Sequence, residues 1–136
     1  MDFRMTVIVA AISLLAMGCV SQQAASVSPS AQLQMVRLTL AINDNNSVQT
    51  FNISVENGTT LFDILNLTEK IEYKDYGAMG MLVTSINGTA QNEGGNAKYW
   101  QFYVGGKLGE VGVSAYRIER PQSIEFRYET IDPGLS

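Results

Sequence analysis

Hydrophobic and polar residues alternate along several short segments of the chain, and this pattern is typical of strands that are buried on one side. In residues 35–42 the apolar side chains stand at every second position, and residues 48–56 repeat the pattern. The turn-forming residues 44–47 separate the two segments, so they predict a β-hairpin. The same reasoning predicts further strands at residues 71–76, 81–86, 99–104, 107–110 and 123–129.

One segment has helical spacing instead. Thr59 or Thr60 can cap a helix, and Asp63 suits the positive end of a helix dipole. The apolar stripe that follows, through about residue 69, consists of Leu61, Phe62, Ile64 and Leu65. A hairpin, one helix and then several strands indicate an α+β fold in two layers. We expect a β-grasp-like arrangement, a mixed sheet with one helix packed across one face.

Two segments have no clear alternation. Residues 89–98 are polar and rich in glycine, which predicts a mobile loop. Residues 113–116 are long enough for one helical turn.

The first 34 residues do not belong to this pattern. Arg4 precedes about a dozen uncharged apolar or small residues, the length of a signal-peptide core and too short to cross a bilayer comfortably. We interpret residues 1–18 as a signal peptide and the Ser-, Gln- and Ala-rich residues 19–34 as a flexible tether. Residues 35–131 are then the folded domain, and residues 132–136 are a tail.

The single cysteine of the chain, Cys19, directly follows the predicted signal peptide. Residues 14–19 resemble a lipobox, the signal for lipidation of a cysteine, although Ala16 occupies the usual leucine position. Two acyl chains on Cys19 would anchor the domain stably to a membrane. An ordinary cleaved signal and a retained N-terminal helix are the alternatives. All three place the domain outside the cytoplasm, and lipidation places it at the outer face of the cell membrane.

Sites for N-linked glycans are also predicted. The pattern Asn-x-Ser/Thr occurs five times, at Asn45, Asn52, Asn57, Asn66 and Asn87. Glycosylation would suit an exported domain, whereas the alternative is that these asparagines simply stand in turns and on strand faces.

The composition narrows the chemistry. The chain has no histidine and one cysteine, which excludes Ser-His-Asp and Cys-His catalytic sites, intrachain disulfides and cysteine-rich zinc sites. The net charge of −4 argues against nucleic-acid binding. A glycosidase needs two facing carboxylates, and the spacing of Asp75, Glu93 and Glu110 selects no pair. We therefore expect no catalytic residue, no metal site and no cofactor.

Several motifs resemble a known family. They are residues 60–65 (TLFDIL), 83–88 (VTSING), 99–107 (YWQFYVGGK), Gly112, Tyr116 and 124–128 (IEFRY). Together they resemble the C-terminal domain of transcobalamin and intrinsic factor, and related standalone microbial domains, over about residues 36–130. In the cobalamin carriers this domain closes over a corrinoid that a separate helical domain mainly holds. The resemblance implies a soluble-ligand-binding β-grasp fold and a binding role, with a corrinoid as one candidate ligand.

The aromatic segment 99–104 carries the candidate site. Alternation places Trp100 and Phe102 in the core, and puts two tyrosines and an amide on the open face of the sheet. Such a surface can stack on a flat ligand or a sugar, or it can simply support the neighbouring strands. We expect residues from 73–76 and from the loop 91–97 to line the same face. The predicted ligand-binding residues are Tyr99, Gln101, Tyr103, Tyr73, Tyr76 and Asn92.

Three functions follow. The first is a membrane-anchored, extracytoplasmic, non-catalytic binding module for a corrinoid or other small molecule, which requires an accessible open face. The second is a cell-envelope module that binds a protein or a glycan, which predicts an exposed apolar patch or an unpaired strand edge. The third is a hydrolase, which requires a cleft with two facing carboxylates.

Overall fold

The computed structural model describes residues 32–131, and the predictions for residues 1–31 and 132–136 lie outside the described residues. These include the signal peptide, Cys19, most of the tether and the tail. The described residues belong to one compact unit, residues 31–136. Its buried core is built from side chains between Val36 and Tyr128, so a chain that starts at Ala31 retains the whole core.

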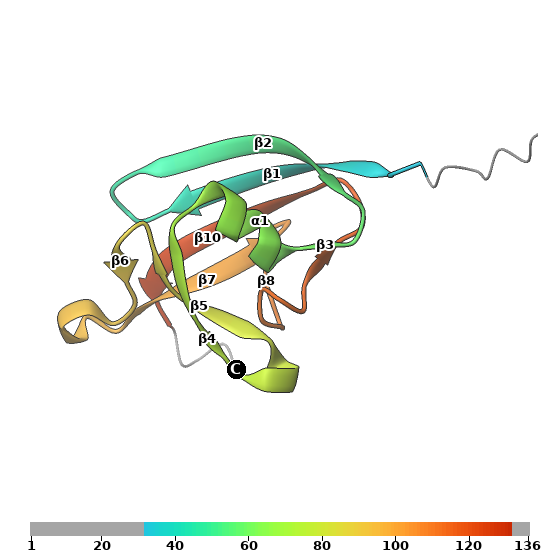
Figure 1. The fold of residues 1–136 in the computed structure, drawn as a ribbon. Coiled ribbons are helices and arrows are strands. Elements are labelled where there is room, and N and C mark those ends of the chain that lie inside the picture. Colours follow the sequence, from blue (N-terminus) through green and yellow to red (C-terminus); the bar gives the residue numbers. More distant parts are fainter. Residues whose placement is uncertain (1–31, 132–136) are drawn as a thin grey trace, which may run out of the picture. The chain divides into compact units, whose positions relative to one another are not determined.

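The main sheet has five strands in the order β2-β1-β10-β7-β8. Its strands are β1 (Met35–Asn43), β2 (Val48–Glu56), β7 (Lys98–Val104), β8 (Lys107–Leu108) and β10 (Gln122–Thr130). The central strands β1 and β10 run parallel, and the other neighbours run antiparallel. Helix α1 (Leu61–Thr68) lies across one face of the sheet (Figure 1). The predicted α+β class, with a mixed sheet and one α-helix, is confirmed.

Helix α1 forms where the capping residue and the apolar stripe coincide. The Thr60 hydroxyl oxygen accepts the backbone N–H of Asp63 at 3.1 Å, and the hydroxyl donates to the Asp63 carboxylate at 2.6 Å. Such a cap stabilises a helix by about 1 kcal/mol. The buried side chains of the helix are Leu61, Ile64 and Leu65. They pack against the apolar face of the sheet, which joins the two layers of the fold.

Two smaller sheets complete the domain. One contains β4 (Ile71–Asp75), β5 (Met81–Ile86) and β6 (Thr89–Ala90), with a 3-10 turn at Gly77–Met79 between the first two. The other pairs β3 (Thr59–Thr60) with β9 (Arg117–Ile118). Within residues 32–131, no helix has the length and apolar character needed to span a membrane.

The prediction of a mobile loop over residues 89–98 was wrong in part. Its first two residues form β6, a short 3-10 turn occupies Glu93–Gly95, and Lys98 begins β7. These elements carry polar side chains and glycines instead of an apolar pattern. Strand β6 pairs with β5, the 3-10 turn is closed by local bonds such as that from Asn96 N–H to the Glu93 carbonyl, and the Asn96 side chain donates to the Tyr128 hydroxyl of β10. Residues 113–116 form a turn in which the Gly112 carbonyl accepts the N–H groups of Ala115 and Tyr116.

Candidate functional site

Strand β7 divides its side chains as the alternation predicts. Trp100 and Phe102 are 3% and 7% exposed and belong to the core. Tyr99, Gln101 and Tyr103 are half-buried on the opposite, open face of the sheet. The open face is therefore accessible, as the small-molecule hypothesis requires.

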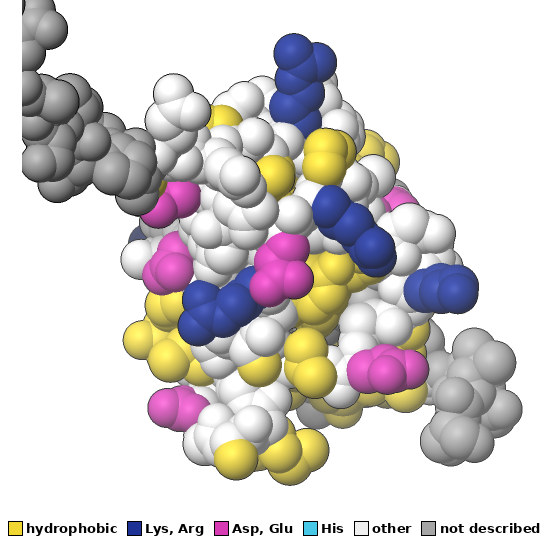
Figure 2. Space-filling view, turned by 90° about the vertical axis from the view of Figure 1, so that its right-hand side faces the viewer, with side chains coloured by type: hydrophobic (Ala, Val, Ile, Leu, Met, Phe, Trp, Pro, Cys, Tyr) yellow, Lys and Arg dark blue, Asp and Glu magenta, His cyan; other side chains and the backbone are white. Residues whose placement is uncertain are grey.

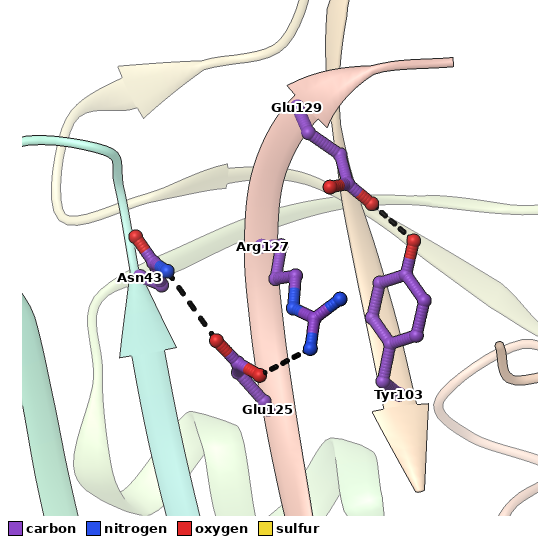
Figure 3. A network of polar contacts seen from close by, with 5 residues as sticks. All are labelled: Asn43, Tyr103, Glu125, Arg127 and Glu129. Atoms are coloured by element: carbon purple, nitrogen blue, oxygen red, sulfur yellow. Dashed lines mark hydrogen bonds and ion pairs between the residues drawn. The ribbon is translucent and has the colours of Figure 1, made fainter. Parts of the chain in front are cut away.

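A network of polar contacts occupies this open face (Figure 3). Glu125 accepts hydrogen bonds from Arg127 Nη2 at 2.7 Å and from Asn43 Nδ2 at 3.3 Å. The guanidinium carbon of Arg127 lies 4.1 Å from the centre of the Tyr103 ring, and the Tyr103 hydroxyl donates to Glu129. Each of these side chains contacts a neighbour on an adjacent strand or on the same strand.

The network also sets the charge state of the open face. The hydrogen bond from Arg127 lowers the pKa of the Glu125 carboxyl, so Glu125 is ionised at neutral pH. Burial, and then the hydrogen bond to Glu129 and its negative charge, raise the pKa of Tyr103. Tyr103 is therefore neutral. Arg127 covers one face of its ring and Glu129 accepts from its hydroxyl, so a flat ligand could stack on that face only by displacing Arg127.

Two of the other predicted site residues lie elsewhere. The ring of Tyr73 contacts Phe62 of α1 at a centroid distance of 4.8 Å, and α1 covers the opposite face of the main sheet. Tyr76 follows β4, whose partner in the smaller sheet is β5. The expectation that both tyrosines line the open face was wrong, because β4 does not continue the main sheet.

The third of these residues, Asn92, organises its own loop. Its side-chain oxygen accepts the backbone N–H of Ala97 at 3.1 Å, and the backbone N–H of Asn92 donates to the Lys98 carbonyl. The loop is also fastened at Asn96, which donates to the hydroxyl of Tyr128 at 2.9 Å. The Asn92 amide therefore holds the chain that leads into β7.

A second accessible site is a groove between the β4–β5 hairpin and the segment after β8. Its volume is about 490 Å³, and its lining includes Tyr76, Met79, Leu82, Glu110, Val111 and Gly112. Four of these are large apolar side chains with exposed fractions of 40% to 77%. In Figure 2, hydrophobic side chains gather in the lower part of the view, where the hairpin projects. A contiguous exposed apolar surface of this kind usually marks a binding site.

The walls of this groove are joined by backbone hydrogen bonds. The N–H groups of Gly112 and Val113 donate to the carbonyls of Met79 and Met81 at 3.0 and 2.9 Å. The approach is so close that a Cβ atom on Gly112 would lie 2.7 Å from the carbonyl carbon of Gly80. Gly80 itself has φ +89°, a conformation that favours glycine. The groove is thus built before any ligand binds.

Acidic residues do not form a catalytic or metal arrangement in the groove. Glu110 is the one carboxylate of its lining, and Asp75 accepts the N–H of Gly77 at 2.8 Å beneath the hairpin turn. Among residues 32–131, no three His, Cys, Asp or Glu side chains come together in a way that could hold a metal ion.

All five predicted glycan acceptors are exposed, at Asn45, Asn52, Asn57, Asn66 and Asn87. The side-chain amides of three donate hydrogen bonds, namely Asn45 to Tyr128, Asn57 to Glu119 and Asn87 to Glu69. The oxygen of Asn52 accepts from Thr39 at 3.0 Å. Exposure permits glycosylation, which stays a prediction.

The sequence reasoning missed Leu82 and Val111 in the groove. Leu82 stands in the run Met81-Leu82-Val83, where strand alternation forces one large apolar side chain outward. Val111 is an isolated apolar residue between Glu110 and Gly112. Both signals were visible, but nothing in the sequence shows that the two residues meet.

Comparison with known proteins gives a family and a fold. The model of a family described as "Domain of unknown function (DUF4430)" matches residues 58–130, which are more than half of the chain. No curated protein matches the sequence.

Solved structures with a similar fold include the following two. One is haptocorrin in complex with Cbi, with a TM-score of 0.64 and 17% identity over 73% of this chain. This chain spans about a quarter (26%) of haptocorrin. The other is a "putative metal binding protein" from Ruminococcus gnavus ATCC 29149, with a TM-score of 0.62 and 11% identity, covering 71% of this chain and 99% of that one. At these identities the similarity shows a shared fold.

Proposed function

The chain belongs to the DUF4430 family, and we propose that it is a non-catalytic module that binds a small molecule in the groove beside the β4–β5 hairpin. The observation that carries the proposal is the mainly apolar hollow of about 490 Å³ with preformed walls. Small-molecule sites are commonly hollows of about 300–1,000 Å³ lined by apolar side chains and a few polar groups. The open face is a weaker candidate, since its polar groups already bind one another.

The side chains of the groove favour an amphipathic ligand. Met79 is 77% exposed, and its flexible thioether can adapt to an irregular apolar surface. The ring of Tyr76 offers a flat surface for stacking. Glu110 at the rim can accept hydrogen bonds from amide or amino groups of the ligand. We therefore infer a ligand with an apolar face and a hydrogen-bond-donating edge.

A corrinoid is the first candidate ligand. Its ring is apolar on its faces and carries amide side chains at its edge, which suits the groove. The motif resemblance to the cobalamin carriers and the likeness in fold to haptocorrin support this choice. A corrinoid is larger than the groove, so this domain would cover one part of it while another chain or domain covers the rest.

We further propose that the module works outside the cytoplasm, anchored through Cys19. The signal-like residues 1–18 and the five exposed Asn-x-Ser/Thr sites support this location. Mass spectrometry of the mature chain tests it directly. A mature N-terminus at Cys19 carrying acyl chains supports the anchor, and an unmodified Cys19 within an intact chain contradicts it.

Equilibrium dialysis of residues 31–136 against cobinamide and cobalamin tests the ligand. We expect saturable binding that Val111→Glu weakens, because a carboxylate is placed in the apolar groove, while Tyr103→Phe on the open face has no effect. The opposite result, binding weakened only by Tyr103→Phe, would move the site to the open face. No binding at about 1 mM, the weak end of specific affinity, would remove corrinoids from consideration.

A protein-interaction role is the second candidate. The observation that favours it is the outer edge of β2, which lies at the end of the strand order in the main sheet and has no further partner among residues 32–131.

A further inference from the structure

The outer edge of β2 lacks the protection that edge strands usually have. Among residues 32–131, no strand pairs with it beyond β1, although β2 is nine residues long. Native proteins usually guard such an edge with lysine, proline, a bulge or a short strand. The strand VQTFNISVE has none of these, and its one charged residue is Glu56 at the end. The other edge strand, β8, has only two residues and includes Lys107.

The register of the hairpin shows which backbone groups of β2 are free. The backbone N–H of Asn57 donates to the Gln34 carbonyl, and the Ser47 carbonyl accepts the N–H of Asp44. Asn57 and Ser47 are odd-numbered, so the backbone N–H and C=O groups of the odd-numbered residues of β2 point toward β1. In an antiparallel pair, the backbone groups of the alternate, here even-numbered, residues point away from the partner strand. The backbone N–H and C=O groups of Thr50, Asn52 and Ser54 therefore point outward and are ready to pair.

An apolar furrow runs beside this edge. It lies between β2 and α1, has a volume of about 320 Å³, and is lined in part by Ile53, Val55, Ile64 and Leu67. Leu67 is 86% exposed, although it is a leucine on the only α-helix of the described residues. A strand added to β2 would bring side chains over this furrow.

We propose that two copies of this domain pair through their β2 edges, antiparallel, about a two-fold axis at Asn52. In this register all nine residues overlap, and the outward backbone groups of the two strands coincide. Phe51 lies opposite Ile53 of the second copy on the furrow side, an aromatic and β-branched pair that favours sheet association. The two five-stranded sheets would join into one sheet of ten strands.

The sequence of β2 is self-complementary in this register, which favours a second copy as the occupant. An isologous interface brings the same strand of each copy together, so residue i faces residue j and j faces i, and a strand with several like charges would repel itself. Here Thr50 lies opposite Ser54, Asn52 opposite Asn52, and Glu56 opposite Val48, so no like charges face each other. The interface would also cover the furrow and part of Leu67 on both copies. A glycan on Asn52 would stand at the two-fold axis, so glycosylation there and pairing should exclude each other.

Sedimentation equilibrium of residues 31–136 tests this proposal through a charge exchange at the axis. We expect the unglycosylated chain to dimerise reversibly at concentrations between about 1 μM and 1 mM, the range of weak specific association. Asn52→Lys or Asn52→Glu should each raise the dimer dissociation constant at least about tenfold, because like charges then face each other across the axis. An equimolar mixture of the two variants should restore the dimer.

The control is Ser123→Lys, which adds the same charge on the same open face but on β10, inside the sheet. It should dimerise like the unmodified chain, and thermal unfolding confirms that each variant folds. A chain that stays monomeric to about 1 mM overturns the proposal and leaves the edge free for an extended peptide from another protein. A dimer that is unaffected by Asn52→Lys, or one that the mixture does not restore, also overturns it.

Discussion

The open face of the main sheet and the groove beside the β4–β5 hairpin are both accessible, but they differ in whether their side chains already have partners. On the open face, Arg127, Glu125 and Tyr103 contact one another and present a surface that needs no ligand. In the groove, Met79, Leu82 and Val111 leave apolar surface in water above a floor of paired backbone. Covering apolar surface releases free energy, whereas replacing internal hydrogen bonds gains little. Aromatic residues on a strand therefore identify a binding site poorly unless their partners are known.

The largest expected effect concerns the floor of the groove. Gly112→Ala places a Cβ atom 2.7 Å from Gly80 and Met81, so the hairpin must shift. We expect the free energy of unfolding to fall by about 1–3 kcal/mol, typical of overpacking, and ligand binding in the groove to be lost. Urea denaturation and equilibrium dialysis measure the two effects.

Gly88→Ala is the matched control for that change. Gly88 has φ +87° with nothing within 4 Å of the added Cβ, so it reports backbone strain without a clash. Wild-type ligand affinity in Gly112→Ala would contradict a preformed groove.

The next effect separates the two regions by ligand affinity. Leu82→Asp in the groove should weaken binding about tenfold, which corresponds to about 1.4 kcal/mol, while Tyr99→Ala on the open face should leave it unchanged. Leu82 is 40% exposed on the hairpin, so the substitution should cost little stability. Titration calorimetry with the ligand found by dialysis measures both variants, and equal losses in both would make the groove assignment untenable.

A smaller effect is expected from the open-face network. Arg127→Ala removes the ion pair to Glu125 and the contact with the Tyr103 ring. Both side chains of the ion pair are about one-third exposed, so we expect a loss of only about 0.5–1 kcal/mol in the free energy of unfolding. Arg127→Lys keeps the charge and serves as the control. A gain in ligand affinity on uncovering Tyr103 would show that the open face can bind after all.

The smallest effect is a pH dependence. Arg127 lowers the pKa of Glu125 below the ordinary value of 4.5, so ionised Glu125 contributes stability above that pH. The contribution disappears as the pH falls through the lowered pKa of the folded state. The difference in unfolding free energy between the wild type and Glu125→Gln should therefore shrink between about pH 5 and pH 3. A difference that stays constant over this range would contradict an ionised pair.

Tyr103 provides the opposite case at high pH. Its pKa is raised above 10.0, so the folded state disfavours the phenolate. Stability from this group is complete below pH 10.0 and decreases as the pH rises above that value. Ultraviolet titration of the wild type and of Tyr103→Phe measures this effect. The difference between the two curves should show that the Tyr103 hydroxyl loses its proton above pH 10.0.

Most of the fold could be predicted from local patterns. The alternation of residues 35–42 became β1, and Thr60 with Asp63 capped α1 as the spacing predicts. The formation of these elements depends on interactions between residues close in the sequence, namely on which face of a strand is apolar and which backbone N–H group of a helix is capped. The short strand β6 escaped prediction because two residues are too few to show alternation, and β9 escaped because its partner β3 lies far away in the sequence.

The candidate site was harder to predict for the same reason. Tyr99, Gln101 and Tyr103 were placed correctly on the open face, since period-two alternation is a local property. Tyr73 and Tyr76 were misplaced, because the sheet that β4 joins depends on long-range pairing. The engagement of Tyr103 depends on Arg127 of β10, which is adjacent only in space.

The sequence by itself determined the strand faces, the capped helix, the α+β class and the absence of histidine chemistry, because each depends on residue type and local spacing. The tertiary structure alone decided which exposed groups are already satisfied and which are not. It joined Met79 and Leu82 of the hairpin to Val111 across a contact between Gly80 and Gly112, and it left the edge of β2 unpaired within residues 32–131. Both outcomes depend on contacts between residues far apart in the chain, which only folding brings together.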